Sequence, residues 1–287
     1  SVDALISRYY LSRSYASLAE SSRKDRRRIL EKLRETRGDA PVKGLQPRHI
    51  QADIDALAPF AARNRLKTWR ALCGFAESIG WIDDDPSRSV PWPKTKTDGY
   101  AIWSDADLAT FRERWPLGSR ERLAFELLIG TGQRRSDIVA LGWQNVRGDR
   151  LELRQKKTGK RLSLPIPDAV SAALDHCDRA RMTFLETAYG AAMTAAGFGN
   201  WFRRACDAAG LAERSAHGLR HAKARLLAEA GATPHEIQAI TGHESLAEVQ
   251  RYTKAAEQAR LATKAALRLE QEQNSGNPMR PNWKLAE

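Results

Sequence analysis

Cysteine is scarce in this chain of 287 residues, which contains only Cys73, Cys177 and Cys206. Because the three are odd in number and far apart, they predict neither a disulfide framework nor a zinc site, and they favour a reducing compartment. The sequence also lacks an apolar run long enough to cross a membrane, and it lacks a secretory signal. A cytoplasmic protein is therefore expected.

Acidic residues are outnumbered, with 35 Asp+Glu against 47 Lys+Arg and a formal net charge of +12. This balance predicts attraction to a polyanion, most plausibly nucleic acid, although charge alone leaves a merely basic soluble protein as an equal alternative. Hydrophobic residues make up 42% of the chain, which permits a packed core. The length suits one large domain or two ordinary ones, and the absence of a methionine at Ser1 leaves room for an upstream segment.

Strand-like alternation is missing from the amino-terminal third, where apolar residues recur at helical spacing. Helices that pack together are expected over residues 21–36, 49–57 and 64–78. The basic run 23–28 suits a phosphate-contacting face, but such runs are more often solvated helix surface. Trp69 is expected in the core of these helices rather than as a platform for a base.

A boundary follows these helices, because Pro86 disfavours helix at the residue before it. The Pro- and Lys-containing segment 90–99 predicts an extended linker. Ser104 then begins a second domain as a helix cap, with Asp107 three residues further on.

The second domain is predicted to be mostly helical with one clear hairpin. Residues 151–155 and 161–164 alternate apolar and polar, and the Lys156–Lys160 turn between them has a glycine where a positive φ is needed. Helices are expected over 104–114, 119–130, 168–178, 190–196, 200–209, 217–230 and 233–241. Another is expected to begin near Ser245, followed by a separate final helix over 255–273.

Several short motifs in this domain carry side chains that suit an anionic substrate. Gly132 permits a tight turn before Arg134, and Asp137 lies one helical turn beyond, where its carboxylate would hold the guanidinium. His217 and His221 are spaced like a pair of metal ligands, but no nearby carboxylate or cysteine completes a ligand set. Taken singly, each motif has an ordinary explanation, such as a surface ion pair, a solubilising turn or a core tyrosine.

Taken in order and spacing, five motifs resemble those of the tyrosine recombinases, also called phage-type integrases, over residues 104 to about 265. They are Thr131–Asp137 with Arg134, the hairpin Lys157-Thr-Gly, His217-Gly-Leu-Arg220, Gly242-His243, and Tyr252 nine residues past His243. Three positions depart from the family pattern. Gln133 stands where an apolar residue is common, Lys254 where a histidine is common, and Lys156 beside Lys157 leaves two candidates for the hairpin lysine.

The resemblance implies a mainly α fold with a small β-hairpin or sheet, in the two-domain tyrosine-recombinase architecture. It implies a helical core DNA-binding domain over 1–90, a linker over 91–103 and a mixed α/β catalytic domain over 104–273. Residues 274–287 would form a tail that is mobile or docks on a partner. The two domains would form a C-shaped clamp around double-stranded DNA.

The resemblance also implies a homo-oligomer, four protomers on two DNA sites, with accessory DNA-bending proteins as further candidate partners. No cofactor, metal or membrane is implied, and the expected location is the bacterial cytoplasm, associated with the nucleoid. The implied function is a site-specific recombinase or integrase of a mobile genetic element. A type IB-like topoisomerase or resolvase, and a non-catalytic DNA-binding protein of the same fold, are the alternatives.

The implied site clamps a scissile phosphate between positively charged groups. Arg134 and Arg220 have planar forks that suit the developing charge, His243 and in part His217 would hydrogen-bond the same group, and Asp137 would support Arg134.

The implied nucleophile is Tyr252, which would attack the phosphorus to give a 3′-phosphotyrosine and a free 5′-hydroxyl. Its phenol has an ordinary pKa near 10, so the proton must be removed, and His217 is the expected acceptor. Lys157 is the expected donor of a proton to the leaving 5′-oxygen.

Overall fold

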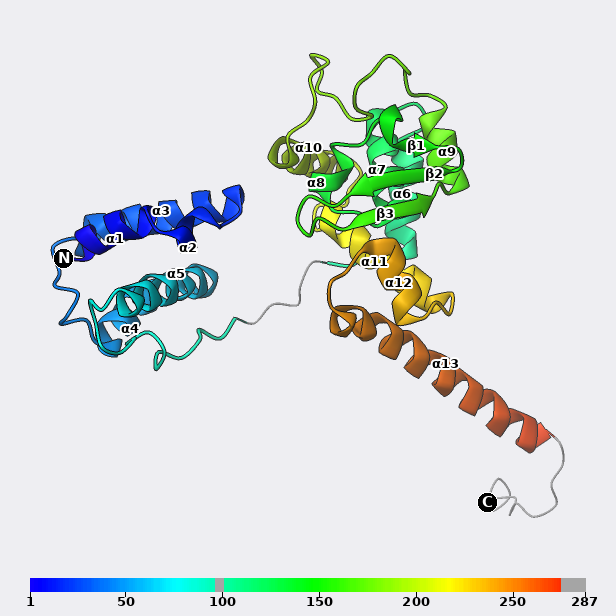
Figure 1. The fold of residues 1–287 in the computed structure, drawn as a ribbon. Helices are drawn as coiled ribbons and strands as arrows, with labels where there is room; N and C mark the ends of the chain where they lie inside the picture. Colours follow the sequence, from blue (N-terminus) through cyan, green and yellow to red (C-terminus); the bar gives the residue numbers. More distant parts are fainter. Residues whose placement is uncertain (96–100, 275–287) are drawn as a thin grey trace, which may run out of the picture. The chain divides into compact units, whose positions relative to one another are not determined.

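The computed structural model describes residues 1–95 and 101–274, and the chain divides into two compact units, Ser1–Thr97 and Asp98–Glu287 (Figure 1). Most of the described chain is helical, and three short antiparallel strands form a sheet, so the predicted fold class is confirmed. Part of the expected linker and nearly all of the expected tail lie outside the described residues.

The first unit is a bundle of helices whose apolar faces share one core. Leu30 and Leu66 are fully buried in it, and Trp69 is 2% exposed with its indole Nε1 donating to Asp53 Oδ2 at 2.8 Å. The core position expected for Trp69 is therefore confirmed, as are the three predicted helices. The helices are α1 (Val2–Tyr10), α2 (Arg13–Ala16), α3 (Glu20–Arg37), α4 (Pro47–Asp55) and α5 (Pro59–Ser78).

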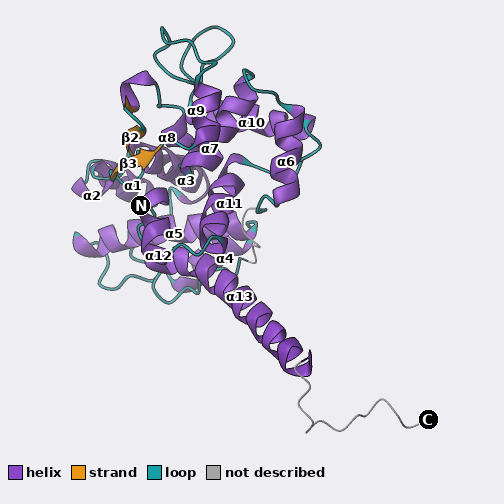
Figure 2. Ribbon diagram, turned by 90° about the vertical axis from the view of Figure 1, so that its right-hand side faces the viewer, coloured by secondary structure: helices purple, strands orange, loops and turns teal. Residues whose placement is uncertain are grey.

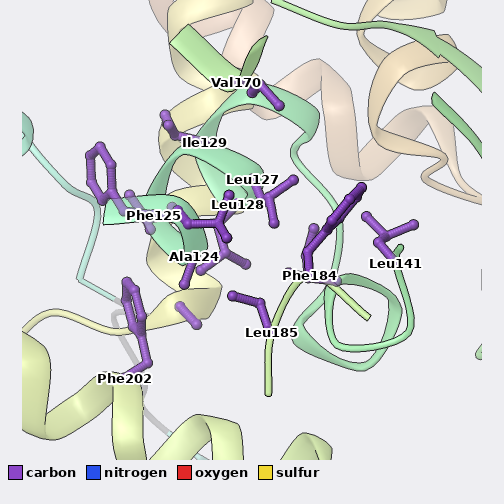
Figure 3. Close-up of a cluster of buried hydrophobic side chains, with 14 of the residues drawn as sticks. Ala124, Phe125, Leu127, Leu128, Ile129, Leu141, Val170, Phe184, Leu185 and Phe202 are labelled. Atoms are coloured by element: carbon purple, nitrogen blue, oxygen red, sulfur yellow. The ribbon is translucent and has the colours of Figure 1, made fainter. Parts of the chain in front are cut away.

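The second unit surrounds the helix α7 (Arg120–Thr131), which contacts α9 (Asp168–Leu174) and α11 (Ala216–Glu229). Side chains on all sides of α7 are buried, including Phe125 and Leu128 (Figure 3), which is the pattern of a helix enclosed by its domain. The other elements are α6 (Asp105–Arg114), α8 (Arg135–Ile138), η1 (Trp143–Asn145), β1 (Val146–Arg147), β2 (Arg150–Arg154), β3 (Arg161–Pro165), α10 (Ala195–Ala208), α12 (Pro234–Thr241) and α13 (Leu246–Asn274).

Helix caps in this unit agree with the sequence. The Ser104 hydroxyl accepts from the Asp107 amide at 3.2 Å, while the Asp107 carboxylate accepts from the Ser104 amide at 2.7 Å, completing the expected capping box. Thr233 and Glu236 form the same reciprocal pair at the start of α12.

The predicted hairpin is confirmed, with Leu151 opposite Leu164 and Leu153 opposite Leu162 on the buried face. Its turn contains Gly159 at a φ of +71°. The strand β1, which was not predicted, pairs with β2 to give the order β1-β2-β3.

Two helix predictions are wrong. The separate helix expected over 190–196 is absent, because Gly190 adopts a φ of +73° in a turn and the Thr194 hydroxyl caps α10, which begins only at Ala195. The helices expected on either side of residue 254 are one continuous helix, α13, since no proline or glycine interrupts residues 246–274. The helix expected over 168–178 ends earlier, at Leu174.

Helix α13 leaves the second unit as a single straight rod (Figures 1 and 2). Its first turns pack on α11 and α12 through a small cluster built around Ala228, Ile237 and Val249, with Tyr252 at its edge. Beyond Ala256 the described side chains of α13 are exposed. No helix among the described residues has the length and apolarity to cross a membrane.

Candidate active site

Two helices of the second unit end at glycines in the left-handed conformation, and each glycine is followed closely by a predicted catalytic residue. Gly132 ends α7 at a φ of +65° and is followed by Gln133 and Arg134. Gly242 ends α12 at a φ of +68° and is followed by His243. Because L-residues with a side chain rarely adopt this backbone conformation, glycine is needed at both turns.

Arg220, on α11, lies between these two helix ends and is 2% exposed. Its Nη1 donates to the carbonyl oxygens of Gly132 at 2.9 Å and Thr241 at 2.6 Å. Both carbonyls are at helix carboxyl ends, where the helix dipole favours a cation. The backbone therefore fixes the guanidinium before any substrate is present.

The other terminal nitrogen of this guanidinium, Nη2, has no hydrogen-bond partner in the described part of the chain. Arg220 Nη2 and Arg134 Nη1 are both buried without a hydrogen bond among the described residues. Burial first, and then the positive charge of Arg134, lower the pKa of Arg220 to about 10. Two such donors on neighbouring guanidinium groups that line one cavity suit an anion, whose oxygens would accept from both.

All six predicted catalytic residues line one cavity of about 750 Å³ in the second unit. They come from five segments: the start of α8, the hairpin turn, α11, the loop after α12, and α13. The structure therefore brings the six side chains to the wall of one cavity. The six residues are Arg134, Lys157, His217, Arg220, His243 and Tyr252.

His243 is buried and its ring orientation is set by Thr241. The Thr241 hydroxyl gives its only proton to the Ile237 carbonyl at 2.6 Å, so at its 2.6 Å contact with His243 the Nδ1 must be the donor. Nε2 is then the remaining acceptor of the neutral ring. Burial first, and then the positive charges of Arg220 and Arg134, lower the pKa of His243 to about 3. The ring is therefore neutral, and Nε2 donates to a phosphate only after the negative charge of the phosphate has raised this pKa enough for the ring to be protonated.

His217 is half-buried, and burial together with His221 and Arg220 lowers its pKa to about 4. A neutral imidazole is able to accept a proton, which is the role expected for this residue. Its ring lies edge-on to that of His221, with 4.8 Å between the ring centroids.

The Tyr252 phenol contacts Nδ1 of His221, a residue for which the sequence predicted no catalytic role. Burial raises the pKa of Tyr252, and the nearby Arg251 and Arg220 only partly oppose this. The phenol is therefore protonated near neutral pH before DNA arrives. An imidazole four residues from His217, and hence on the same helix face, was the available signal.

The two hairpin lysines are separated by the structure. Lys157 lines the cavity that holds the arginines, whereas Lys156 lines a different depression beside α8. Both side chains are exposed, so each ammonium retains the freedom to move within its reach.

Asp137 does not hold Arg134, contrary to the expectation from their spacing. Its Oδ1 accepts from the backbone amide of Lys156 at 2.8 Å, and no ion pair with Arg134 forms among the described residues. Arg134 precedes the first turn of α8 with an extended backbone, which breaks the i, i+3 geometry that helical spacing assumed. Asp137 instead fastens the hairpin turn to α8.

From the sequence, His217 and His221 are not expected to bind a metal ion together. Within residues 1–95 and 101–274, no three His, Cys, Asp or Glu side chains are grouped to hold a metal ion.

The comparisons with known proteins agree with this geometry. A family described as the phage integrase family matches residues 106–259. The chain belongs to the phage integrase family. The matched range includes all six predicted catalytic residues, and the recombinase resemblance predicted from the five motifs is confirmed.

One relative of this integrase-family chain is the tyrosine recombinase XerD of Mycobacterium leprae (strain TN), 32% identical over 225 residues, covering 70% of this chain and 71% of the relative. The match with three such relatives spans between 66% and 77% of their length.

Among solved structures, a lambda integrase (75–356) dimer bound to a COC′ core site has a TM-score of 0.76 at 21% identity. That likeness covers 87% of this chain and 94% of the other. A lambda integrase tetramer bound to a Holliday junction has a TM-score of 0.72, also at 21% identity, over 84% of this chain and 77% of the other. At these identities the likeness concerns the fold.

Proposed function

We propose that this tyrosine recombinase cleaves and rejoins DNA strands at a specific site through a 3′-phosphotyrosine intermediate. One observation carries the proposal: two buried guanidinium nitrogens, on Arg134 and Arg220, lack acceptors in the cavity that also contains a phenol. A scissile phosphodiester supplies the missing acceptors through its nonbridging oxygens. The negative charge that grows on those oxygens during attack strengthens the same bonds, which is transition-state stabilisation.

In the first step, Tyr252 Oη forms a bond to phosphorus as the bond from phosphorus to the 5′-oxygen breaks. The phenol proton passes to an imidazole. His217 is the acceptor expected from the sequence, and the contact of the phenol with His221 makes that ring a second candidate. The reverse step, with a 5′-hydroxyl of another strand as nucleophile, restores the phosphodiester and releases the phenol.

The leaving 5′-oxygen takes a proton from Lys157. The position of Lys157 in the cavity favours it over Lys156, which faces a different depression. An alkoxide is a strong base and a poor leaving group, so a proton donor at this point typically contributes 100- to 10,000-fold in rate.

The DNA partner is double-stranded, and we propose that four protomers act on two sites. The net charge of +12 and the helical first unit suit contacts to a phosphate backbone, so residues 1–90 are proposed as a core DNA-binding domain, with 91–103 as the linker and 104–273 as the catalytic domain. Exposed leucines on the long α13, Leu261, Leu267 and Leu269, suit docking on a neighbouring protomer. A location on the bacterial nucleoid and accessory DNA-bending partners belong to the same proposal.

A topoisomerase or resolvase shares the cleavage step and differs in the strand that is rejoined. A non-catalytic DNA-binding protein has no use for a phenol beside two arginines that each keep one buried nitrogen without an acceptor among the described residues, and the cavity therefore disfavours it.

The test is covalent capture from a pool of nicked duplexes that carry a randomised region. When the strand is cleaved beside a nick, the short fragment that carries the new 5′-hydroxyl diffuses away. Rejoining is then prevented, so an active enzyme remains covalently attached to the DNA. We expect a denaturation-resistant adduct whose peptide contains Tyr252, and sequencing of the trapped ends identifies the site. No adduct from the whole pool, or an equal adduct from Tyr252→Phe, would overturn the proposal. Rejoining assays on the recovered site then separate exchange between two duplexes from relaxation of one.

A further inference from the structure

Two buried glutamines meet where the catalytic segments come together. Gln133 and Gln155 are both fully buried, one beside Arg134 and the other two residues before Lys157. Gln155 Nε2 donates to Gln133 Oε1 at 2.7 Å. They are 22 residues apart in sequence, and neither is in the set of six predicted catalytic residues.

Every hydrogen of the two amide groups has an acceptor. Gln155 Nε2 also donates to the Thr241 carbonyl at 2.9 Å, and Gln133 Nε2 donates to the carbonyls of Ile240 at 2.8 Å and Thr131 at 3.0 Å. A buried polar network with all its donors satisfied fixes one arrangement of the segments it joins, whereas an apolar contact tolerates sliding.

The network connects the hairpin to the arginine side of the cavity through Thr241. The Thr241 carbonyl accepts from both Gln155 and Arg220, and its hydroxyl contacts His243. A Cβ at Gly242 would lie 2.4 Å from Gln155 Nε2, so the glycine that turns the chain toward His243 also makes room for the amide.

The same amide group extends to the turn that carries the lysine. Gln155 Oε1 accepts from the Thr158 hydroxyl at 2.7 Å, and the backbone of Gln155 closes the turn through bonds with Lys160 and Gly159, each of 2.8 Å. Asp137 fixes the turn from the other side through the Lys156 amide. The backbone of the turn is therefore tied to α8 and to the end of α12, while the exposed Lys157 side chain is able to follow the leaving oxygen.

We propose that the Gln133–Gln155 pair is a positioning device that holds the Lys157 turn at a fixed distance from the phosphate clamp. The inference rests on the proposed function, specifically on Lys157 as the proton donor. A displacement of about 1 Å in such a group costs on the order of 100-fold in rate. Replacement of either glutamine by methionine keeps a similar side-chain volume and removes the hydrogen bonds. The core therefore stays filled, while the Lys157 turn is no longer held at a fixed position relative to the two arginines.

The experiment compares two DNA substrates built on the recovered site, one with oxygen and one with sulfur at the bridging 5′ position. A thiolate leaves without a proton, so the sulfur substrate needs no general acid. We expect Gln155→Met to form adduct about 100-fold more slowly than the natural protein with oxygen and within about 5-fold of it with sulfur. Lys157→Ala should show the same selective rescue, whereas Arg220→Met should be slow with both substrates.

Three further variants separate positioning from general loss of stability. Glu126→Gln removes a buried carboxylate that binds Arg112 and Arg122 outside the cavity, so it should lower the melting temperature without selective loss on oxygen. Thr158→Val removes the hydroxyl that donates to Gln155 and accepts a longer bond of 3.4 Å from the Lys160 amide, and it should give a smaller loss of about 10-fold with the same rescue. The double variant Gln133→Met with Gln155→Met should be no slower than Gln155→Met alone, because the two act as one unit.

The outcomes are distinguishable. If the natural protein forms no adduct with either substrate, the proposed function fails. If it forms adduct and Gln155→Met and Thr158→Val are unaffected, or are slowed equally on oxygen and sulfur, the positioning role is wrong and the proposed function stands.

Discussion

The two sides of the cavity are built differently. On the arginine side, Arg220 is almost fully buried and bound to the backbone ends of two helices. On the tyrosine side, Tyr252 is half-buried on a helix that is held by a small cluster and then extends into solvent. We infer from this difference that Arg220 is held in place as firmly as the folded core, whereas Tyr252 lies on a helix that we expect to open more readily.

The largest expected effect falls on the tyrosine side. Tyr252→Phe should abolish the covalent adduct, because it removes the oxygen that is proposed to form the bond to phosphorus. Its free energy of unfolding should change by less than about 1 kcal/mol, since the ring keeps its packing and only the contact with His221 is lost. A denaturing gel with the recovered DNA and a urea titration measure the two quantities. A loss of several kcal/mol would show that the nucleophile is part of the core after all.

The arginine side should show the next largest effect. Arg220→Met should slow cleavage by at least about 100-fold, the typical effect of removing a donor to a developing oxyanion. Stability without DNA should fall by about 1 to 3 kcal/mol, because the carbonyl oxygens of Gly132 and Thr241 lose a buried donor, while relief of the repulsion from Arg134 offsets part of the loss. Single-turnover cleavage and urea unfolding test both parts. Unfolding of the variant at room temperature would contradict the second part.

The two histidines of α11 should divide the proton transfer. His221→Gln should slow cleavage about 10-fold, because His217 still accepts the proton, and the double change with His217→Gln should approach the 100-fold lower limit for a lost general base. The measurement is the rate of adduct formation across pH 4–8, a range that reaches the lowered pKa of His217. An acid limb that stays unchanged in His221→Gln would remove this residue from the step.

The smallest effect concerns stability and pH. The folded-state pKa of His217, about 4, lies below its ordinary value of 6.5, so the unfolded chain binds the proton more readily. The stabilisation is complete above pH 6.5 and is lost as the pH falls toward 4. After allowance for partial exposure we expect about 1 kcal/mol between pH 7 and pH 5. Urea titrations of the natural protein and His217→Gln at both pH values isolate this share, and equal pH slopes for the two proteins would refute it.

Local signals in the sequence predicted much of this molecule. Ser104 and Thr233 identified helix starts because cap side chains bond amides only three residues away, and the hairpin followed from alternation around a glycine turn. The six catalytic candidates could be selected because their residue types and spacing resemble a family pattern. These predictions depend on contacts within about ten residues, or on a pattern that does not require the contacts to be known.

Contacts between distant segments could not be read in the same way. Gln133 departs from an apolar pattern, but its bonds to Gln155 and Ile240 span 22 and 107 residues. The Asp137 carboxylate accepts from the Lys156 amide on the hairpin and does not pair with the Arg134 guanidinium, because the backbone is extended at Arg134. The helix expected over 190–196 is absent for a local reason, since Gly190 turns the chain at a positive φ and Thr194 caps the helix that follows.

Gly132 and Gly242 carry a consequence for protein engineering. Each turns the chain just before a catalytic candidate, and an added Cβ would lie 3.1 Å from Lys223 Cγ in the first case and 2.4 Å from Gln155 in the second. Mutagenesis libraries that seek new DNA target preferences should therefore keep both glycines invariant and place their diversity elsewhere. The members of such a library would differ in DNA recognition, and few of them would have a distorted catalytic site.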